Sequence, residues 1–201
     1  MAGDEKEILA FESADAWERW LADHHADTAS VWLKIMKKGS GQPSVSYSDA
    51  LAVALCFGWI DGQKGAGDDG CWLQRFTPRK PGSRWSKINT EKAAELIEAG
   101  KMRPAGLSEV ERARADGRWD AAYAGQRTMA VPDDLAAALA ANDAARDFFA
   151  TINSVNRYAI LYRIGTAKRP ETRARKIAQY VAMLAGHQTI HPDRASPAAP
   201  D

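Results

Sequence analysis

The chain has 201 residues, of which 45% are hydrophobic and 26% are charged, and its formal net charge is +1. This composition is typical of a folded globular protein and excludes a disordered chain, a collagen-like fibre and a disulfide-rich scaffold. A net charge so close to zero provides no general attraction to nucleic acid or to an anionic membrane.

The first half of the chain combines helical and strand-like patterns. Ser13 is a candidate N-cap for a helix over residues 14–24, where apolar residues repeat at helical spacing. Apolar and polar residues alternate over 31–38 and predict a half-buried strand. Residues 46–58 begin with a capping-box pattern and end at a glycine, which predicts a second helix.

Two further apolar runs, 59–64 and 71–77, predict a β-hairpin around the loop 65–70. The glycines of this loop match the pattern G-x-G-x-x-G of dinucleotide-binding folds. A strand follows the loop where that site needs a helix N-terminus, and two aspartates in the loop would repel phosphate. We therefore interpret the loop as a turn.

The remainder of the chain is mostly helical in pattern. Residues 78–89 form a basic loop, and helices are predicted over 90–99 and from Pro104 to residue 116. Four further helical segments lie between residues 132 and 186, each with apolar residues on one face. These patterns predict that the second half folds as a small helical bundle.

The predicted fold class is α+β. A mixed helix and strand part with a β-hairpin is expected over 1–116, an ordered connector over 117–131 and a small C-terminal helical bundle over 132–186. Residues 187–201 contain three prolines and few apolar side chains, so we predict a disordered tail there.

Several features indicate a cytoplasmic protein without a membrane-inserted segment. The longest strongly apolar stretch, residues 50–60, is too short to span a bilayer, and the N-terminus lacks the plan of a signal peptide. The two cysteines, Cys56 and Cys71, lie in apolar surroundings, and we expect both to be buried, reduced thiols. No histidine or cysteine spacing predicts a metal site, and no phosphate-binding loop is present, so neither a metal nor a cofactor is expected.

Charge is distributed unevenly along the chain. Residues 1–27 hold eight acidic and two basic residues, whereas residues 75–87 hold five basic residues and no acidic one. A third block, 157–176, holds seven basic residues and one acidic residue, and we interpret it as the solvated face of two helices. The block at 75–87 is the more informative one, because aromatic residues are interleaved with its arginines.

A candidate site combines this basic block with one carboxylate. Asp61 lies in an otherwise apolar strand, where a buried acid is costly unless it is paired or hydrogen-bonded. Two interpretations stay open: a structural ion pair, or a pocket in which arginines face an anionic ligand group. The predicted ligand-binding residues are Asp61, Arg75, Thr77, Arg79, Arg84, Trp59 and Trp85.

Three blocks of the sequence also carry a resemblance to a known family: SYSDALAVALCFGWIDGQ, LQRFTPRKPGSRWSKIN and AKRPETRARKI. They resemble the YdeI/OmpD-associated family, also called bacteriocin-protection proteins, from about Phe11 to Gly186. The resemblance implies a role in resistance to antimicrobial peptides and other envelope stress. It carries over no reaction and no catalytic residues.

The function expected from the residues and the resemblance together is binding of an anionic small molecule or peptide at the Asp/Arg pocket. One alternative is an enzyme that uses the same pocket, with Asp61 as acid or base and the arginines stabilising negative charge. Another is a single-strand nucleic-acid-binding module, because basic and aromatic residues alternate in 75–87. Nucleic acid is the less favoured partner, since Trp and Phe are more often core residues than stacking platforms.

Overall fold

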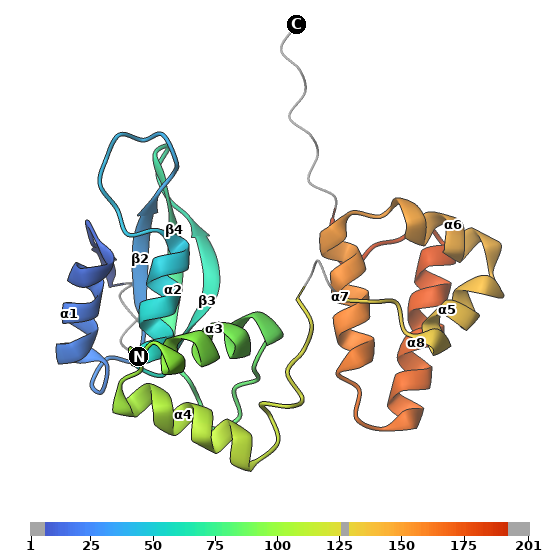
Figure 1. Ribbon diagram of the computed structural model, residues 1–201. Coiled ribbons are helices and arrows are strands. Elements are labelled where there is room, and N and C mark those ends of the chain that lie inside the picture. Colours follow the sequence, from blue (N-terminus) through green and yellow to red (C-terminus); the bar gives the residue numbers. More distant parts are fainter. Residues whose placement is uncertain (1–6, 126–128, 193–201) are drawn as a thin grey trace, which may run out of the picture. The chain divides into compact units, whose positions relative to one another are not determined.

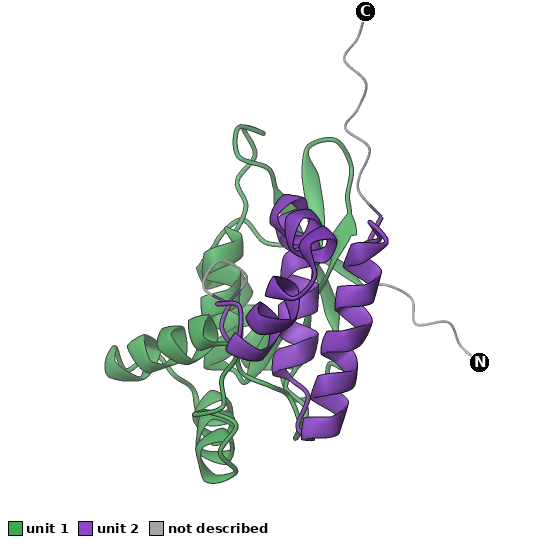
Figure 2. Ribbon diagram, turned by 90° about the vertical axis from the view of Figure 1, so that its right-hand side faces the viewer, with its two compact units in different colours: residues 1–123 green, residues 124–201 purple. Residues whose placement is uncertain are grey.

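A computed structural model describes residues 7–125 and 129–192 of the chain (Figure 1). The chain divides into two compact units, which we call the N-terminal unit, residues 1–123, and the C-terminal unit, residues 124–201 (Figure 2). The predicted α+β fold class is confirmed, because the described residues form eight helices and one four-stranded sheet. As predicted, a mixed helix and strand part with a hairpin precedes a helical bundle.

The N-terminal unit contains the four strands that the structure describes. Its sheet has the order β1-β2-β4-β3, with β1 parallel to β2 and the other neighbours antiparallel. The predicted hairpin is confirmed and is formed by β3 and β4. In chain order the elements are β1 (Ile8–Ala10), α1 (Ala14–His24), β2 (Val31–Met36), α2 (Tyr47–Cys56), β3 (Trp59–Ala66), β4 (Cys71–Pro78), α3 (Lys87–Glu98) and α4 (Pro104–Ala115).

The core of this unit lies between the helices and one face of the sheet. Trp17 and Leu21 of α1, Leu33 of β2 and Phe76 of β4 are fully buried together. The indole nitrogen of Trp17 donates a hydrogen bond of 3.1 Å to the backbone oxygen of Ala50, so α1 and α2 are joined by a polar contact inside the core. Burying these large side chains provides most of the driving force for folding the unit.

Serine caps set the start of three helices. The side chains of Ser13, Ser46 and Ser86 each accept a hydrogen bond of 3.2 Å from the backbone nitrogen three residues later. The first two caps were predicted, and the structure confirms them. Ser86 starts α3 at Lys87, three residues before the predicted start, because the basic loop ends at its cap.

A bulge in β3 positions the first candidate residue. The register of β3 against β4 shifts between Asp61 and Lys64, which leaves backbone carbonyls without ladder partners. The buried Gln74 supplies the missing donor, because its amide nitrogen bonds the backbone oxygens of Gly62 at 3.0 Å and Gln63 at 3.3 Å. The strand therefore keeps a defined path directly after Asp61.

The C-terminal unit is a bundle of four helices, as predicted: α5 (Asp133–Ala140), α6 (Asp143–Thr151), α7 (Ser154–Gly165) and α8 (Pro170–Ala185). Leu135, Ile160, Ile164 and Leu184 are fully buried in its core. Arg173 of α8 pairs with the carboxylate of Asp134 on α5, with 2.9 Å between Nη2 and Oδ1. Each helix thus contributes to one shared core.

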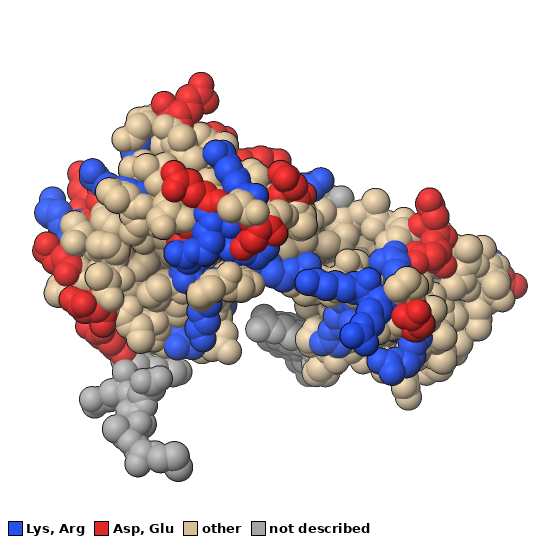
Figure 3. All heavy atoms as spheres, turned by 90° about the horizontal axis from the view of Figure 1, so that it is seen from below, with Lys and Arg blue, Asp and Glu red and all other residues tan. Residues whose placement is uncertain are grey.

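Basic side chains gather on the C-terminal unit on the face shown in Figure 3. Of the basic block 157–176, Arg163, Lys168, Arg169 and Arg175 are exposed. Lys176 is half-buried, and its ammonium group donates 2.8 Å to the backbone oxygen of Arg163 near the end of α7. Such a contact stabilises a helix C-terminus through both a hydrogen bond and the helix dipole.

Residues 187–192 follow α8 and contact the bundle. Ile190 is half-buried against its core. The side-chain amide of Asn156 is fully buried. It donates a hydrogen bond of 3.1 Å to the backbone oxygen of His191 and accepts one of 2.8 Å from the backbone nitrogen of His191. Residues 193–201, the rest of the predicted tail, lie outside the described residues.

Two further sequence expectations concern the cysteines and the membrane. Cys56 and Cys71 are buried and are not joined in a disulfide. Among the described helices, none combines the length and the apolar character needed to cross a membrane.

Candidate functional site

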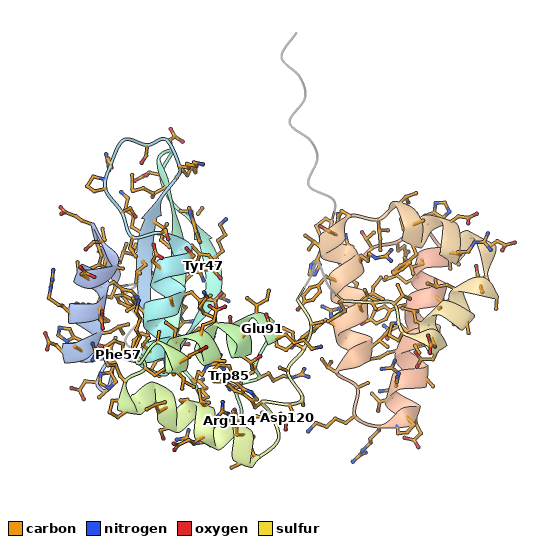
Figure 4. All side chains as sticks on the ribbon, in the orientation of Figure 1. Tyr47, Phe57, Trp85, Glu91, Arg114 and Asp120 are labelled. Atoms are coloured by element: carbon orange, nitrogen blue, oxygen red, sulfur yellow. The ribbon has the colours of Figure 1, made fainter. Side chains whose placement is uncertain are left out.

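The centre of the candidate site is Arg79, the first residue after β4. Its side chain is 6% exposed, and its guanidinium carbon lies 3.5 Å from the centroid of the Trp85 ring. The backbone nitrogen of Arg79 donates a hydrogen bond of 2.9 Å to the backbone oxygen of Gly58. Its Nη1 atom donates a hydrogen bond of 3.2 Å to the backbone oxygen of Arg84. In Figure 4, Trp85 lies between α3 and α4. We call this cluster the Arg79 site.

Two donors of the Arg79 guanidinium are unused. Its Nε and Nη2 atoms are buried and have no hydrogen-bond partner in the described part of the chain. These two nitrogens form the edge of a guanidinium that binds a carboxylate with two parallel hydrogen bonds. The indole nitrogen of Trp85 is buried without a partner as well. Buried donors are normally satisfied, so three unsatisfied donors in one contact cluster call for an acceptor.

The charge on Arg79 is only partly compensated. Burial lowers the pKa of Arg79 to about 10, and the negative charge of Glu109 opposes this most, followed by Tyr123 and Asp61. Glu109 of α4 uses Oε1 to accept a hydrogen bond of 2.7 Å from Arg112, while its Oε2 is buried and unpartnered. At neutral pH the site therefore contains a buried cation that makes no ion pair among the described residues.

The carboxylate of Asp61 lies beside Tyr47, the first residue of α2. The Tyr47 hydroxyl donates 2.8 Å to Asp61 Oδ2, and the tyrosine is 37% exposed (Figure 4). Burial raises the pKa of Tyr47 above its usual range, and the hydrogen bond to Asp61 raises it further. The structure thus replaces the expected pairing of Asp61 with an arginine by a hydrogen bond from a tyrosine.

Arg75 and Thr77 do not join this cluster. Asp61 pairs in register with Phe76, so Asp61 lies on the sheet face that carries Phe76 and the helices. Neighbouring residues on a strand point to opposite faces, which places Arg75 and Thr77 on the other side of the sheet. The Nε atom of Arg75 is buried without a hydrogen-bond partner among the described residues.

Trp59 is a core residue that lies outside the contacts of the Arg79 site. Its side chain is 1% exposed, and its indole nitrogen donates 3.1 Å to the backbone oxygen of His25. Of the seven predicted residues, the structure brings Arg79, Arg84 and Trp85 together, with the charge of Asp61 within reach of Arg79. Arg75, Thr77 and Trp59 lie elsewhere.

Residues that the sequence reading did not include complete the site. The backbone of Tyr123 makes two hydrogen bonds with the basic segment 78–89. It donates one of 3.1 Å to the backbone oxygen of Trp85 and accepts one of 2.9 Å from the backbone nitrogen of Lys87. The guanidinium carbon of Arg84 lies 5.8 Å from the centroid of the Tyr123 ring. Arg118 donates 2.7 Å to the backbone oxygen of Ser83. The predicted connector 117–131 contains two aromatic residues, Trp119 and Tyr123, and nothing in the sequence distinguished Tyr123 as the one that contacts the basic loop.

The described residues hold no group of three or more His, Cys, Asp or Glu side chains arranged to bind a metal ion. What the Arg79 site offers chemically is hydrogen-bond donation from a buried cation, with carboxylates nearby. It is suited to recognise a negatively charged oxygen group.

Two family models match parts of the chain. Residues 9–109 match a family described as "Domain of unknown function (DUF8412)", and residues 128–187 match one described as "Bacteriocin-protection, YdeI or OmpD-Associated". No curated protein and no solved structure matches the chain. The second match confirms the family resemblance seen in the sequence, over a shorter span. The first two sequence blocks that carried the resemblance lie within 9–109.

Proposed function

The chain belongs to the DUF8412 family through residues 9–109, and we propose that this part is a binding module for a carboxylate group at the Arg79 site. The ligand is an anionic small molecule or the carboxylate of a peptide. Residues 128–187 relate the chain to a bacteriocin-protection family, and we propose that binding serves a protective role of that kind.

The unused edge of Arg79 is the observation that carries the proposal. Buried side-chain nitrogen atoms normally have a hydrogen-bond partner, either in the protein or in ordered water. Here Nη1 is bound to Arg84 and one face of the guanidinium is covered by Trp85, while Nε and Nη2 remain unpartnered. The two fixed contacts orient the free edge, so a carboxylate entering the site would meet two donors in a defined direction.

The surrounding charges favour a singly charged ligand. Glu109 and Asp61 both lie close enough to oppose the effect of burial on the pKa of Arg79. Their negative charge would repel a dianionic phosphate more than a carboxylate. We therefore expect carboxylates to bind in preference to inorganic phosphate.

Thermal denaturation of the full chain with acetate, a short peptide bearing a free C-terminus, or inorganic phosphate tests the proposal. A ligand that binds only the folded state raises the melting temperature with its concentration. Arg79→Lys keeps the charge and loses the two-donor edge, so we expect it to abolish the carboxylate effect. Arg114→Lys is the matched control. The guanidinium carbon of Arg114 also lies near a tryptophan, 4.9 Å from the centroid of the Trp119 ring, but Arg114 is exposed.

The outcomes separate the alternatives. Stabilisation of the wild type and Arg114→Lys, but not of Arg79→Lys, supports carboxylate binding at Arg79. Equal stabilisation of all three proteins, or of none, overturns the proposal. Consumption of a stabilising carboxylate, followed by NMR, would favour the enzyme alternative over a binding module.

A further inference from the structure

A separate pocket of about 400 Å³ lies between α1, α2 and the residues that follow α3. Its apolar lining includes Ala52, Val53, Cys56 and Leu96. Neither Arg79 nor Trp85 lines it, so it is distinct from the site proposed above. A volume of this size falls within the range of small-molecule sites.

Opposite charges line two sides of this pocket. The acidic side is formed by Asp15 and Glu18 of α1 and Asp49 of α2, and the basic side by Lys101 and Arg103 between α3 and α4. Glu18 and Arg103 neutralise each other through an ion pair of 2.6 Å.

The remaining charges of the pocket are not paired with one another. Asp49 accepts a hydrogen bond of 2.7 Å from the Ser46 hydroxyl, which leaves its charge in place. Asp15 and Lys101 make no ion pair within the described part of the chain. The pocket thus presents unneutralised carboxylates on one side and an ammonium group on the other.

We propose that this pocket binds a free α-amino acid with an apolar side chain. The ligand's ammonium group would lie toward Asp15 and Asp49, and its carboxylate toward Lys101. Its side chain would cover the surface formed by Val53, Cys56 and Leu96. A zwitterion matches both charged sides at once, whereas a simple anion or cation would be repelled by one of them.

Calorimetric titration of the full-length Arg79→Lys variant, in which the carboxylate site proposed above is disabled, with L-leucine, N-acetyl-L-leucine and L-leucinamide tests this proposal. The acetylated compound lacks the ammonium group and the amide lacks the carboxylate. Each lost charge-assisted contact is expected to weaken binding about tenfold relative to L-leucine. Equal affinity for the three compounds, or no binding of L-leucine, overturns the proposal.

Two pairs of variants locate the binding. Asp15→Asn and Lys101→Gln should each weaken L-leucine binding by roughly fivefold, the effect of losing an exposed charge pair. Asp23→Asn and Lys38→Gln are the controls, since both are exposed charges outside the pocket lining. Unchanged affinity in Asp15→Asn and Lys101→Gln would place L-leucine elsewhere and contradict the proposal.

The thiol of Cys56 provides an independent readout. It is 6% exposed in the pocket lining, and burial raises its pKa to about 11, so alkylation is slow enough to follow by mass spectrometry. L-Leucine should slow alkylation of Cys56 by iodoacetamide and leave Cys71 unchanged, because Cys71 does not line the pocket. Equal effects on both thiols would indicate general stabilisation and overturn the assignment.

The two proposals fail separately. L-Leucine also carries a carboxylate that the Arg79 site can accept, so Arg79→Lys should lose only that binding. It should keep the L-leucine binding that depends on Asp15 and Lys101, because Arg79 is not part of this pocket. Loss of L-leucine binding in Arg79→Lys, with Lys101→Gln unaffected, would transfer the amino acid to the Arg79 site and overturn the pocket assignment.

Discussion

The guanidinium carbon of Arg79 lies 3.5 Å from the centroid of the Trp85 ring, and the two side chains are 6% and 2% exposed. A cation on an aromatic face is worth up to about 2 kcal/mol when it is desolvated. This offsets part of the cost of burying a charge, which amounts to several kcal/mol. The contact therefore makes a buried arginine tolerable, and it fixes the direction of the guanidinium edge.

The first prediction separates the charge of Arg79 from its packing. Arg79→Met keeps an unbranched apolar stem on Trp85 and removes a charge without an ion-pair partner, so we expect the free energy of unfolding to stay within about 1 kcal/mol of the wild type. Arg79→Ala removes the stem as well and should lose about 3 kcal/mol. Urea denaturation measures both. A large loss in Arg79→Met would show that the charge itself stabilises the fold.

The second prediction concerns Tyr47 and Asp61, whose side chains are joined at 2.8 Å. Tyr47→Phe and Asp61→Asn should each reduce the free energy of unfolding by roughly 1 kcal/mol, because each weakens one hydrogen bond to a carboxylate. The double variant should lose less than the sum of the single losses, since the two residues contact each other. Strictly additive losses would mean that the bond contributes nothing to stability.

How far the sequence predicted the fold depended on the range of the interactions. The caps at Ser13 and Ser46 were predictable, because a cap involves a residue and its third neighbour only. The start of α3 was placed too late, since its first turn lies within a basic segment without an apolar period. Strand β1 was not predicted at all. It has three residues, and its pairing with β2 depends on contacts distant in sequence.

The site was harder to predict than the fold. The basic block correctly identified Arg79, Arg84 and Trp85 as neighbours, because they lie in one short loop. The register between β3 and β4 could not be predicted from the sequence, and this register places Asp61 and Arg75 on opposite faces of the sheet. Glu109 lies far along the chain on α4, and nothing in its local pattern connected it to Arg79.

The third prediction is a pH dependence at the tip of the hairpin. The ammonium group of Lys34 lies 2.8 Å from Asp68 Oδ2, and this hydrogen bond lowers the pKa of Asp68 to about 2. A carboxylate whose pKa is lowered by folding contributes stability above its unfolded pKa, and the contribution disappears as the pH falls through the folded value. We therefore expect this contribution to be lost between about pH 4 and pH 2.

Urea unfolding at several pH values checks this window. Asp68→Asn should lower stability at pH 6 and should lose less stability than the wild type between pH 4 and pH 2. Asp69→Asn is the matched control, because Asp69 is an exposed neighbour whose side chain makes no ion pair among the described residues. Identical pH profiles for the wild type and Asp68→Asn would show that the ion pair is absent in solution.

The last prediction concerns two truncations of the chain at its C-terminal end. A chain ending at residue 192 keeps both hydrogen bonds between Asn156 and His191, of 3.1 and 2.8 Å, together with the contact of Ile190 with the bundle core. It should unfold as the full chain does. A chain ending at residue 186 loses all three contacts and leaves the fully buried amide of Asn156 without those partners. Because an unsatisfied buried polar group costs about 1–3 kcal/mol, we expect the C-terminal unit to lose roughly that amount of stability.

Amide hydrogen exchange measures the effect in each unit separately. Protection should fall in α7 and α8, whereas the protection of the sheet in the N-terminal unit should not change. In the chain ending at residue 186, Asn156→Leu should recover part of the lost stability, because it removes the polar group that the truncation exposes. Equal protection of the two truncated chains would mean that residues 187–192 do not hold this position in solution.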